Sequence, residues 1–304
     1  MAVRVKVPAT TANLGSGFDC LGLALGLYNV FTVEEGEEGL HVEVRGESQG
    51  IATTKENLFV QAMEQVFVRV GYRPRGLRVV AENNVPLGRG LGSSATAIVG
   101  GLVAANSLSG NRLGEGELVA LASELEGHPD NVTPALLGGF VTVFTDASGK
   151  AHYQRIVPTV PLKICLAIPD FVLSTRRARE VLPREVPLKD AVFNLGRVAV
   201  LVAALCQGNL EMLRNPELWD DRLHQGYRAG LIPGFDDVMA AAKEAGAYGV
   251  ALSGAGPTVV AFAGEEGDDV SQAMAKAFAR HGVACRSLVT EVSVHGALTS
   301  TEFI

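Results

Sequence analysis

A short run of glycine and serine between two apolar segments constrains this chain more than any other feature. The run PLGRGLGSSATA, residues 86–97, places Gly88, Gly90 and Gly92 just before two adjacent serines. It follows a strand-like segment at residues 76–82. It precedes a segment at residues 94–108 that is apolar on nearly every side, which predicts a buried helix. Glycine weakens both strands and helices, so glycines concentrated in a strand-to-helix turn indicate that the backbone must approach something closely.

The chemistry of a helix N-terminus suggests that this partner is negatively charged. The first turn leaves four N–H groups unpaired and carries about half a positive charge, and a phosphate satisfies both. Ser93 and Ser94 add hydroxyl groups at the same place. The run is not a Walker A loop, because Ser93 stands where that motif needs lysine, and its spacing differs from G-x-G-x-x-G. On this stretch alone, an ordinary glycine-rich turn remains the alternative.

Composition narrows the class of protein. The chain has 304 residues, 47% of them hydrophobic, which is more typical of two domains than of one. A net charge of −7 without a lysine or arginine run argues against nucleic-acid and anionic-membrane partners. The N-terminus alternates like a strand, and no segment has the length of a membrane span, so we expect a cytoplasmic protein. The four cysteines lie far apart in apolar surroundings and are predicted to be buried free thiols.

Hydrophobic periodicity predicts a mixed α+β chain. The stretch SGKAHYQRIVPTVP, which turns polar and contains two prolines, places the division between two domains, residues 1–155 and 156–304. Collapsing the extra helices of the second half gives the order β-α-β-β-α-β, which is that of ferredoxin-like domains. The predicted strands are residues 3–7, 28–34, 40–45, 76–82, 139–145, 161–169, 248–253, 258–263 and 284–292. The predicted helices are residues 57–70, 94–108, 113–126, 175–182, 188–214, 218–228, 235–245 and 270–281.

Three motifs in order resemble those of the GHMP kinases. The glycine-serine run resembles the phosphate loop of that family, PATTANLGSGFDCLGLAL at residues 8–25 resembles its first motif, and ALSGAGPTVVAF at residues 251–262 resembles its third. Together they span nearly the whole chain and make an ordinary turn untenable. The resemblance implies a two-domain GHMP kinase fold. Its N-terminal domain resembles domain 2 of ribosomal protein S5, and its C-terminal domain is ferredoxin-like, as the element order also indicates.

The resemblance also implies an ATP site with Mg²⁺. It assigns the metal to Ser94 and Glu126, with Glu124 as the alternative carboxylate, which suits a cation that prefers a few protein oxygens plus phosphates and water. The residues implied to contact the nucleotide are Asn57, Pro86, Leu87, Gly88, Arg89, Gly90, Leu91, Gly92, Ser93, Ser94, Ala95, Thr96, Gly254 and Gly256.

The remaining polar motifs resemble the branch of the family that acts on L-homoserine. Asp19 suits an ammonium group, although it could instead cap a local turn, and arginine suits a carboxylate because its planar fork binds both oxygens. Arg176 and Arg177 are interpreted as solvated. A substrate with an ammonium, a carboxylate and a hydroxyl is therefore expected, and the reaction implied is its phosphorylation in threonine biosynthesis. The residues implied to bind it are Asn13, Asp19, His128, Asn131, Thr175, Arg179 and Arg228, and those implied in catalysis are Asn13, Asp19, Asn131 and Arg179.

Some alternatives stay open at this point. Asn131 stands where mevalonate kinases place an aspartate, and an amide cannot be a base, so we infer that the γ-phosphate or solvent accepts the proton. Asp130 is the rival candidate for a base. Another GHMP kinase, of the mevalonate-pathway type, is the closest alternative function, and a non-catalytic nucleotide- or RNA-binding protein is the more distant one. The family also implies a homodimer.

Overall fold

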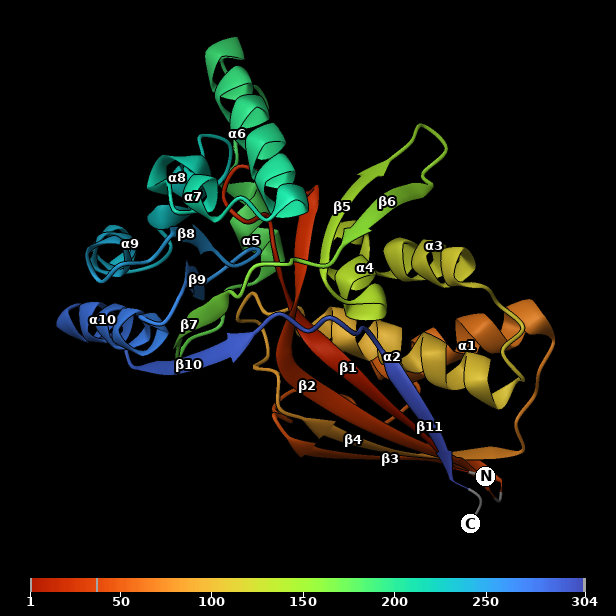
Figure 1. Ribbon diagram of the computed structural model, residues 1–304. Coiled ribbons are helices and arrows are strands. Elements are labelled where there is room, and N and C mark those ends of the chain that lie inside the picture. The colour runs from red at the N-terminus through yellow and green to blue at the C-terminus, as the bar shows by residue number, and fades with distance from the viewer. Residues whose placement is uncertain (1, 37, 303–304) are drawn as a thin grey trace.

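The computed structural model describes residues 2–36 and 38–302. Its first layer, counted as a sheet together with the helices packed on it, has seven strands, and helices cover one face of the sheet (Figure 1). Buried and exposed side chains alternate at the start of the first strand: Val3 and Val5 are buried, while Arg4 and Lys6 are exposed. One face of the sheet is therefore apolar and is covered by the helices. The strands are β1 (Ala2–Ala12), β2 (Leu21–Glu35), β3 (Gly39–Gly46), β4 (Gly76–Asn83), β5 (Phe140–Thr145), β6 (Ala151–Ile156) and β11 (Leu298–Glu302). The helices are α1 (Leu58–Val70), α2 (Ser93–Leu108), α3 (Glu115–Glu126) and α4 (Pro129–Leu137).

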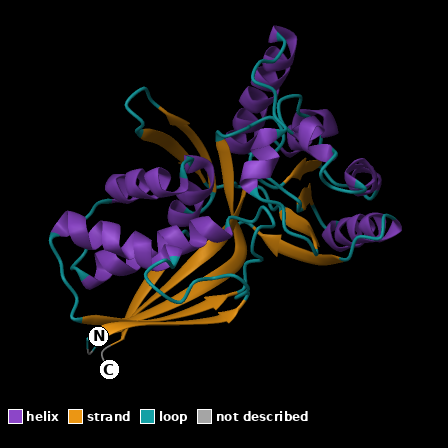
Figure 2. Cartoon of the chain, turned by 180° about the vertical axis from the view of Figure 1, so that it is seen from behind, coloured by secondary structure: helices purple, strands orange, loops and turns teal. Residues whose placement is uncertain are grey.

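The second layer is an antiparallel sheet of four strands with two helices packed on it (Figure 2). Its strands are β7 (Lys163–Pro169), β8 (Gly249–Leu252), β9 (Val259–Ala263) and β10 (Cys285–Glu291), and its helices are α9 (Phe235–Glu244) and α10 (Gly267–Arg280). The spatial order β10-β7-β9-β8 places the first and third strands at the centre. This confirms the predicted β-α-β-β-α-β arrangement and the α+β class.

Between β7 and β8 the chain inserts several further helices. These are α5 (Thr175–Glu180), α6 (Leu188–Gln207), α7 (Leu210–Leu213), a 3₁₀ helix (Pro216–Trp219) and α8 (Gln225–Ala229). The prediction of one helix over residues 188–214 was wrong, because Gly208 adopts a left-handed conformation and ends α6. A continuous helix over residues 218–228 was also wrong. The Asp221 carboxylate accepts N–H bonds from three following residues and so stabilises a turn there.

Three elements were not predicted: α4, β6 and β11. The last of these pairs antiparallel with β1, so the C-terminal end of the chain belongs to the first sheet. The division into domains between residues 155 and 156 stays a prediction. Strand β11 lies after that division in the sequence but pairs with β1 in the first sheet.

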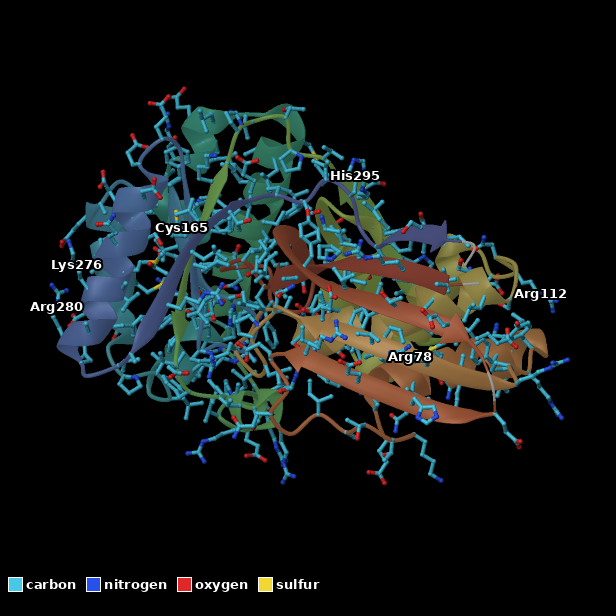
Figure 3. The ribbon with its side chains drawn as sticks, turned by 90° about the horizontal axis from the view of Figure 1, so that it is seen from below. Arg78, Arg112, Cys165, Lys276, Arg280 and His295 are labelled. Carbon is cyan, nitrogen blue, oxygen red and sulfur yellow. The ribbon has the colours of Figure 1, made fainter. Side chains whose placement is uncertain are left out.

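The cysteines are less uniformly buried than predicted. Cys165 on β7 is buried and donates its thiol to the carbonyl of Gly267 at 3.1 Å (Figure 3). Cys20 and Cys285 are partly buried, and Cys206 is exposed. The prediction failed for Cys206 because it lies near the end of α6, on a side of that helix that nothing in the described chain covers. Within residues 2–36 and 38–302, no helix combines the length and the apolar character that crossing a bilayer would require.

Candidate active site

The glycine-serine run forms a tight turn that presents the N-terminus of α2. Gly90 and Gly92 have φ values of 73° and 67°, in the left-handed region. A Cβ at Gly90 would lie 2.2 Å from the carbonyl oxygen of Ser253, and one at Gly92 would lie 1.9 Å from Oγ1 of Thr10. Only glycine fits at these two positions. The N–H groups of residues 88–95 have no partner within the described residues, so they are available to an anion.

This turn lies against a cavity of about 380 Å³, which is lined by strands and helices of the first sheet and by the β8–β9 turn and helices of the second half of the chain. The predicted residues that line it are Asn13, Asp19, Asn57, Leu87, Gly88, Arg89, Gly90, Leu91, Gly92, Ser93, Ser94, Glu126, His128, Asn131, Thr175, Arg179, Arg228, Gly254 and Gly256. Three predicted residues do not line it: Pro86, Ala95 and Thr96 are buried beneath the turn. Thr96 accepts a bond from Asn29 and donates to the carbonyl of Ser93, so it supports the turn from behind.

The apolar end of the cavity was not predicted. It is formed by side chains from β2, β3, β4, α1 and the segment before α1: Phe31, Val42, Ile51, Leu58, Phe59, Val79 and Ala81. These residue types in these elements have the same sequence signature as ordinary core, so no pattern could separate them. Asn57 borders this end, but its side chain already caps α1 by accepting from the N–H of Phe59 and donating to the carbonyl of Ala52.

The turn between β8 and β9 holds the glycine-serine run in place. Ser253 donates its hydroxyl to the carbonyl of Gly90 at 2.6 Å. Gly254 donates its N–H to the carbonyl of Ala12 and accepts a bond from the Asn13 side chain at 2.9 Å. The three motifs far apart in the sequence therefore meet at one place. Arg89 points elsewhere with its guanidinium, because it bonds the carbonyl of Phe171 and the carboxylate of Asp170.

Ser94 and Glu126 form an oxygen pair at the edge of the cavity. The Ser94 hydroxyl donates to Oε1 of Glu126 at 2.5 Å, although 32 residues separate them. Burial raises the pKa of the Glu126 carboxyl, and the nearby Asp130 raises it further. Glu124 is exposed and does not line the cavity. A carboxylate and a hydroxyl oxygen suit Mg²⁺, and a cation there would relieve the unfavourable burial of the carboxylate charge.

Asp19 and Arg179 form a two-pronged ion pair across the cavity. The Nη1 and Nη2 atoms of Arg179 donate to Oδ2 and Oδ1 of Asp19, each at 2.9 Å. The main-chain N–H of Asp19 donates to Oδ1 of Asn13, and this bond holds the loop that carries Asp19 in place. About a third of each charged side chain is exposed, so solvent or a ligand can reach the pair. The pair offers one group of each sign at one place.

A second arginine lies deeper in the same wall. Arg228 is 1% exposed, and it donates from Nε to the carbonyl of Ala178 and from Nη1 to the carbonyl of Gly254, both at 3.0 Å. Burial and the charge of Arg179 lower the pKa of Arg228 to about 10, so it is protonated at neutral pH. Thr175, the first residue of α5, lines the cavity near these groups.

The start of α4 supplies the remaining polar side chains. Nδ1 of His128 lies 2.6 Å from Oδ1 of Asp130. Burial lowers the pKa of His128, but the hydrogen bond and charge of Asp130 outweigh it, so the net pKa is raised. Asn131 accepts from the Thr10 hydroxyl at 2.8 Å and donates to Asp130 at 3.3 Å. Both Asp130 and Asn131 line the cavity, beside the glycine-serine turn.

Comparison with known proteins gives consistent matches along the chain. Residues 57–139 match the family described as "GHMP kinases N terminal domain", and residues 201–280 match "GHMP kinases C terminal". A homoserine kinase of Caldicellulosiruptor bescii is 48% identical over 91% of this chain and 89% of its own length. One of Carboxydothermus hydrogenoformans is 48% identical over 97% of this chain and 96% of its own length. The crystal structure of a homoserine kinase from Cytophaga hutchinsonii superposes with a TM-score of 0.90 at 30% identity, covering 98% of this chain and 97% of that one.

Proposed function

The chain belongs to the GHMP kinase family, and from that premise we propose that it phosphorylates L-homoserine. ATP and L-homoserine give ADP and O-phospho-L-homoserine, the step that serves threonine biosynthesis. The observation that carries the proposal is the juxtaposition of the Asp19–Arg179 ion pair with Arg228 beside the free N–H groups of the α2 N-terminus. An amino acid carries one charge of each sign, so Asp19 can take its ammonium while the two arginines take its carboxylate.

The nucleotide would bind along the glycine-serine turn, with its base toward the apolar end of the cavity. The unpaired N–H groups of residues 88–95 suit the phosphates, and the positive end of the α2 dipole favours their charge. Ser94 and Glu126 would hold Mg²⁺, which when bound neutralises phosphate charge and orients the phosphates. In the described part of the chain, no group of three or more histidine, cysteine or carboxylate side chains could hold a metal. The cation would therefore take much of its coordination from phosphates and water.

Positioning and electrostatics supply most of the catalysis in this proposal. Phosphoryl transfer needs an in-line hydroxyl and neutralised charge more than covalent help. Asp19, Arg179 and Arg228 fix the amino-acid end of the substrate, so the side-chain hydroxyl is directed to the turn. Asn13 holds the Asp19 loop, and Asn131 offers an amide beside the transferred group. The γ-phosphate or solvent accepts the hydroxyl proton.

A single assay separates the proposal from its alternatives. We expect ADP release with L-homoserine that depends on Mg²⁺, and little release with mevalonate, which has no ammonium for Asp19. Release with mevalonate alone would favour a mevalonate-pathway kinase. Retention of RNA on a filter without ADP release would favour a binding protein, although the net charge of −7 opposes that. A cytoplasmic location remains part of the proposal.

Substitution of Asp130 tests the absence of a general base. Asparagine keeps the size of this buried side chain and can still accept from His128, so we expect Asp130→Asn to lower kcat less than about tenfold, against the 10²–10⁴-fold that a general base contributes. Steady-state kinetics with L-homoserine measure this. Loss of most of kcat at an unchanged KM would show instead that Asp130 takes the proton.

A homodimer is also part of the proposal, and α6 supports it. This helix projects from the body of the chain, beside the β5–β6 hairpin (Figure 1). Its outer side is apolar: Leu188, Val192 and Leu195 are 80%, 57% and 65% exposed. With Ala199 they are spaced alternately by four and three residues, the spacing of a helix that packs against another helix. The same stripe on a second copy of the chain would be its natural complement.

Substitution within this stripe tests the dimer. Leu195→Lys places a charge in the middle of the proposed contact, so we expect the mass in solution to fall from that of two chains to that of one. Val68→Lys is the matched control, because Val68 is 81% exposed on α1, away from α6. Light scattering after size exclusion measures both. A Leu195→Lys variant that keeps the mass of two chains would remove α6 from the interface.

A further inference from the structure

A buried histidine lies behind Arg228 and has no part in the mechanism given above. His224 immediately precedes α8, and its side chain is fully buried. Its Nδ1 lies 3.2 Å from Nη1 of Arg228, one helical turn further on. Its ring also stacks on Phe18, with ring centres 5.1 Å apart, and Phe18 precedes Asp19 in the substrate loop. The ring thus touches elements on both sides of the amino-acid end of the cavity.

The two partners of the imidazole define a single protonation state. Nε2 lies 2.8 Å from the carbonyl oxygen of Gly15, which can only accept, so Nε2 must carry a hydrogen. A guanidinium can only donate, so Nδ1 must present a lone pair to Arg228. The neutral ring with hydrogen on Nε2 satisfies both contacts. A second proton on Nδ1 would set one donor against another and place two positive charges side by side.

The charged groups around the ring agree with this state. Burial lowers the pKa of His224, and the charge of Arg228 lowers it further, whereas Asp221 and Asp19 raise it. The Asp221 carboxylate, with Oδ2 3.6 Å from Nε2, is the nearest negative group. Its oxygens already accept from the main-chain N–H groups of residues 223–225 and from the Asn194 amide. That carboxylate is therefore well stabilised without a charged imidazole.

The effect of these contacts falls on Arg228. Ala178, Gly254 and His224 together fix Nε and Nη1, while Nη2 has no hydrogen-bond partner within the described residues. Arg179 differs, since Asp19 is its only hydrogen-bond partner among the residues that the structure describes, and its side chain is partly exposed. One arginine of the cavity is thus held in place before the ligand binds, and the other can change partners when it does.

We propose that neutral His224 is a positioning residue, which accepts a hydrogen bond from Arg228 and so holds that guanidinium ready for the carboxylate of the amino-acid substrate. This rests on the proposed function. Loss of the hydrogen bond between His224 and Arg228 should weaken the binding of the substrate carboxylate and leave nucleotide binding unchanged. It should also fail in acid, because the ring holds Arg228 only above its own pKa and is lost as an acceptor when the pH falls through that value.

Two substitutions of His224 by amide residues test its contact with Arg228 and its contact with Gly15 one at a time. His224→Asn places an oxygen near the position of Nδ1 and keeps an acceptor for Arg228. His224→Gln places its amide near Nε2, so it keeps the bond to Gly15 and loses the acceptor. We expect His224→Gln to raise KM for L-homoserine about tenfold or more, as for a lost bond to a charged group, with kcat and KM for ATP little changed. His224→Asn should stay within about threefold of the parent chain in all three constants.

Two further readouts distinguish positioning from a merely structural role. The effect of His224→Gln should vanish for 3-amino-1-propanol, which has the ammonium and hydroxyl of homoserine but no carboxylate. The parent chain should show KM for L-homoserine rising as the pH falls through the lowered pKa of His224, and His224→Asn should show a smaller rise, which comes only from other titrating groups of the cavity such as His128. Equal loss in both variants for both alcohols, or an acid rise in His224→Asn as large as that of the parent chain, would overturn the inference. If the parent chain releases no ADP with L-homoserine, the proposed function itself fails, which is a separate result.

Discussion

Replacement of Glu126 by glutamine is expected to lower kcat by about a hundred- to a thousandfold, the range found when one electrostatic contact to a transition state is removed. The amide keeps the shape of the side chain and can still bond Ser94, but it carries no charge for a cation. Raising the Mg²⁺ concentration should recover part of the lost rate, because the remaining oxygens would bind the cation more weakly. ADP release at several Mg²⁺ concentrations measures this.

Glu124→Gln is the matched control for that variant. Glu124 lies on the same helix and in the same short sequence, but its side chain is exposed and does not line the cavity. We expect kcat within about twofold of the parent chain. If Glu124→Gln lost the activity and Glu126→Gln kept it, the cation site would have to be rebuilt around the other carboxylate.

Replacement of Arg179 by glutamine is expected to lower kcat/KM for L-homoserine by about a hundredfold, since a hydrogen bond to a charged group contributes about 1.5–3 kcal/mol and this guanidinium would bond the substrate carboxylate. The change removes a carboxylate partner and also leaves Asp19 without its counter-charge. The loss should be much smaller for 3-amino-1-propanol, because that alcohol has no carboxylate to bind. Steady-state kinetics with both alcohols measure the difference.

Arg177→Gln tests whether the loss is specific to position 179. Arg177 lies on the same short helix, α5, and is exposed, so its charge faces water rather than the cavity. Its removal should change kcat/KM less than twofold. Equal losses in the two variants would mean that α5 contributes only a diffuse positive field, and that the substrate carboxylate binds elsewhere.

The position of the glycine-serine turn was predictable from the sequence, because the residue types that form it are adjacent in the chain. Glycines that must adopt positive φ and serines at a helix start are visible as residue types, and α2 begins at Ser93, one residue from the predicted position. The second sheet was likewise predictable, since its strands are short apolar runs between clear turns. Asp19 and Arg179 were each predicted for the substrate, but the ion pair between them was not. The contact joins residues 160 positions apart, and no local pattern encodes it.

The elements that were not predicted lack a local sequence signal, for physical reasons that differ between them. Helix α4 contains Pro134 within its nine residues, and proline normally argues against a helix interior. Strand β11 has five residues, LTSTE, of which only the first is apolar, so it shows no alternation of apolar and polar side chains. Its stability comes from pairing with β1. His224 gives no signal in the sequence, because its role depends on Arg228 and on the carbonyl of Gly15, 209 residues away.

The central claim is that main-chain N–H groups at the start of α2 bind the phosphates of ATP while fixed charges orient an amino alcohol toward them. A crystal structure with a non-hydrolysable ATP analogue, Mg²⁺ and L-homoserine tests it most directly. We predict the β- and γ-phosphates within hydrogen-bond distance of the N–H groups of residues 88–95, and the homoserine carboxylate on Arg228. A triphosphate bound away from this turn, or homoserine reversed with its hydroxyl on the arginines, would contradict the account.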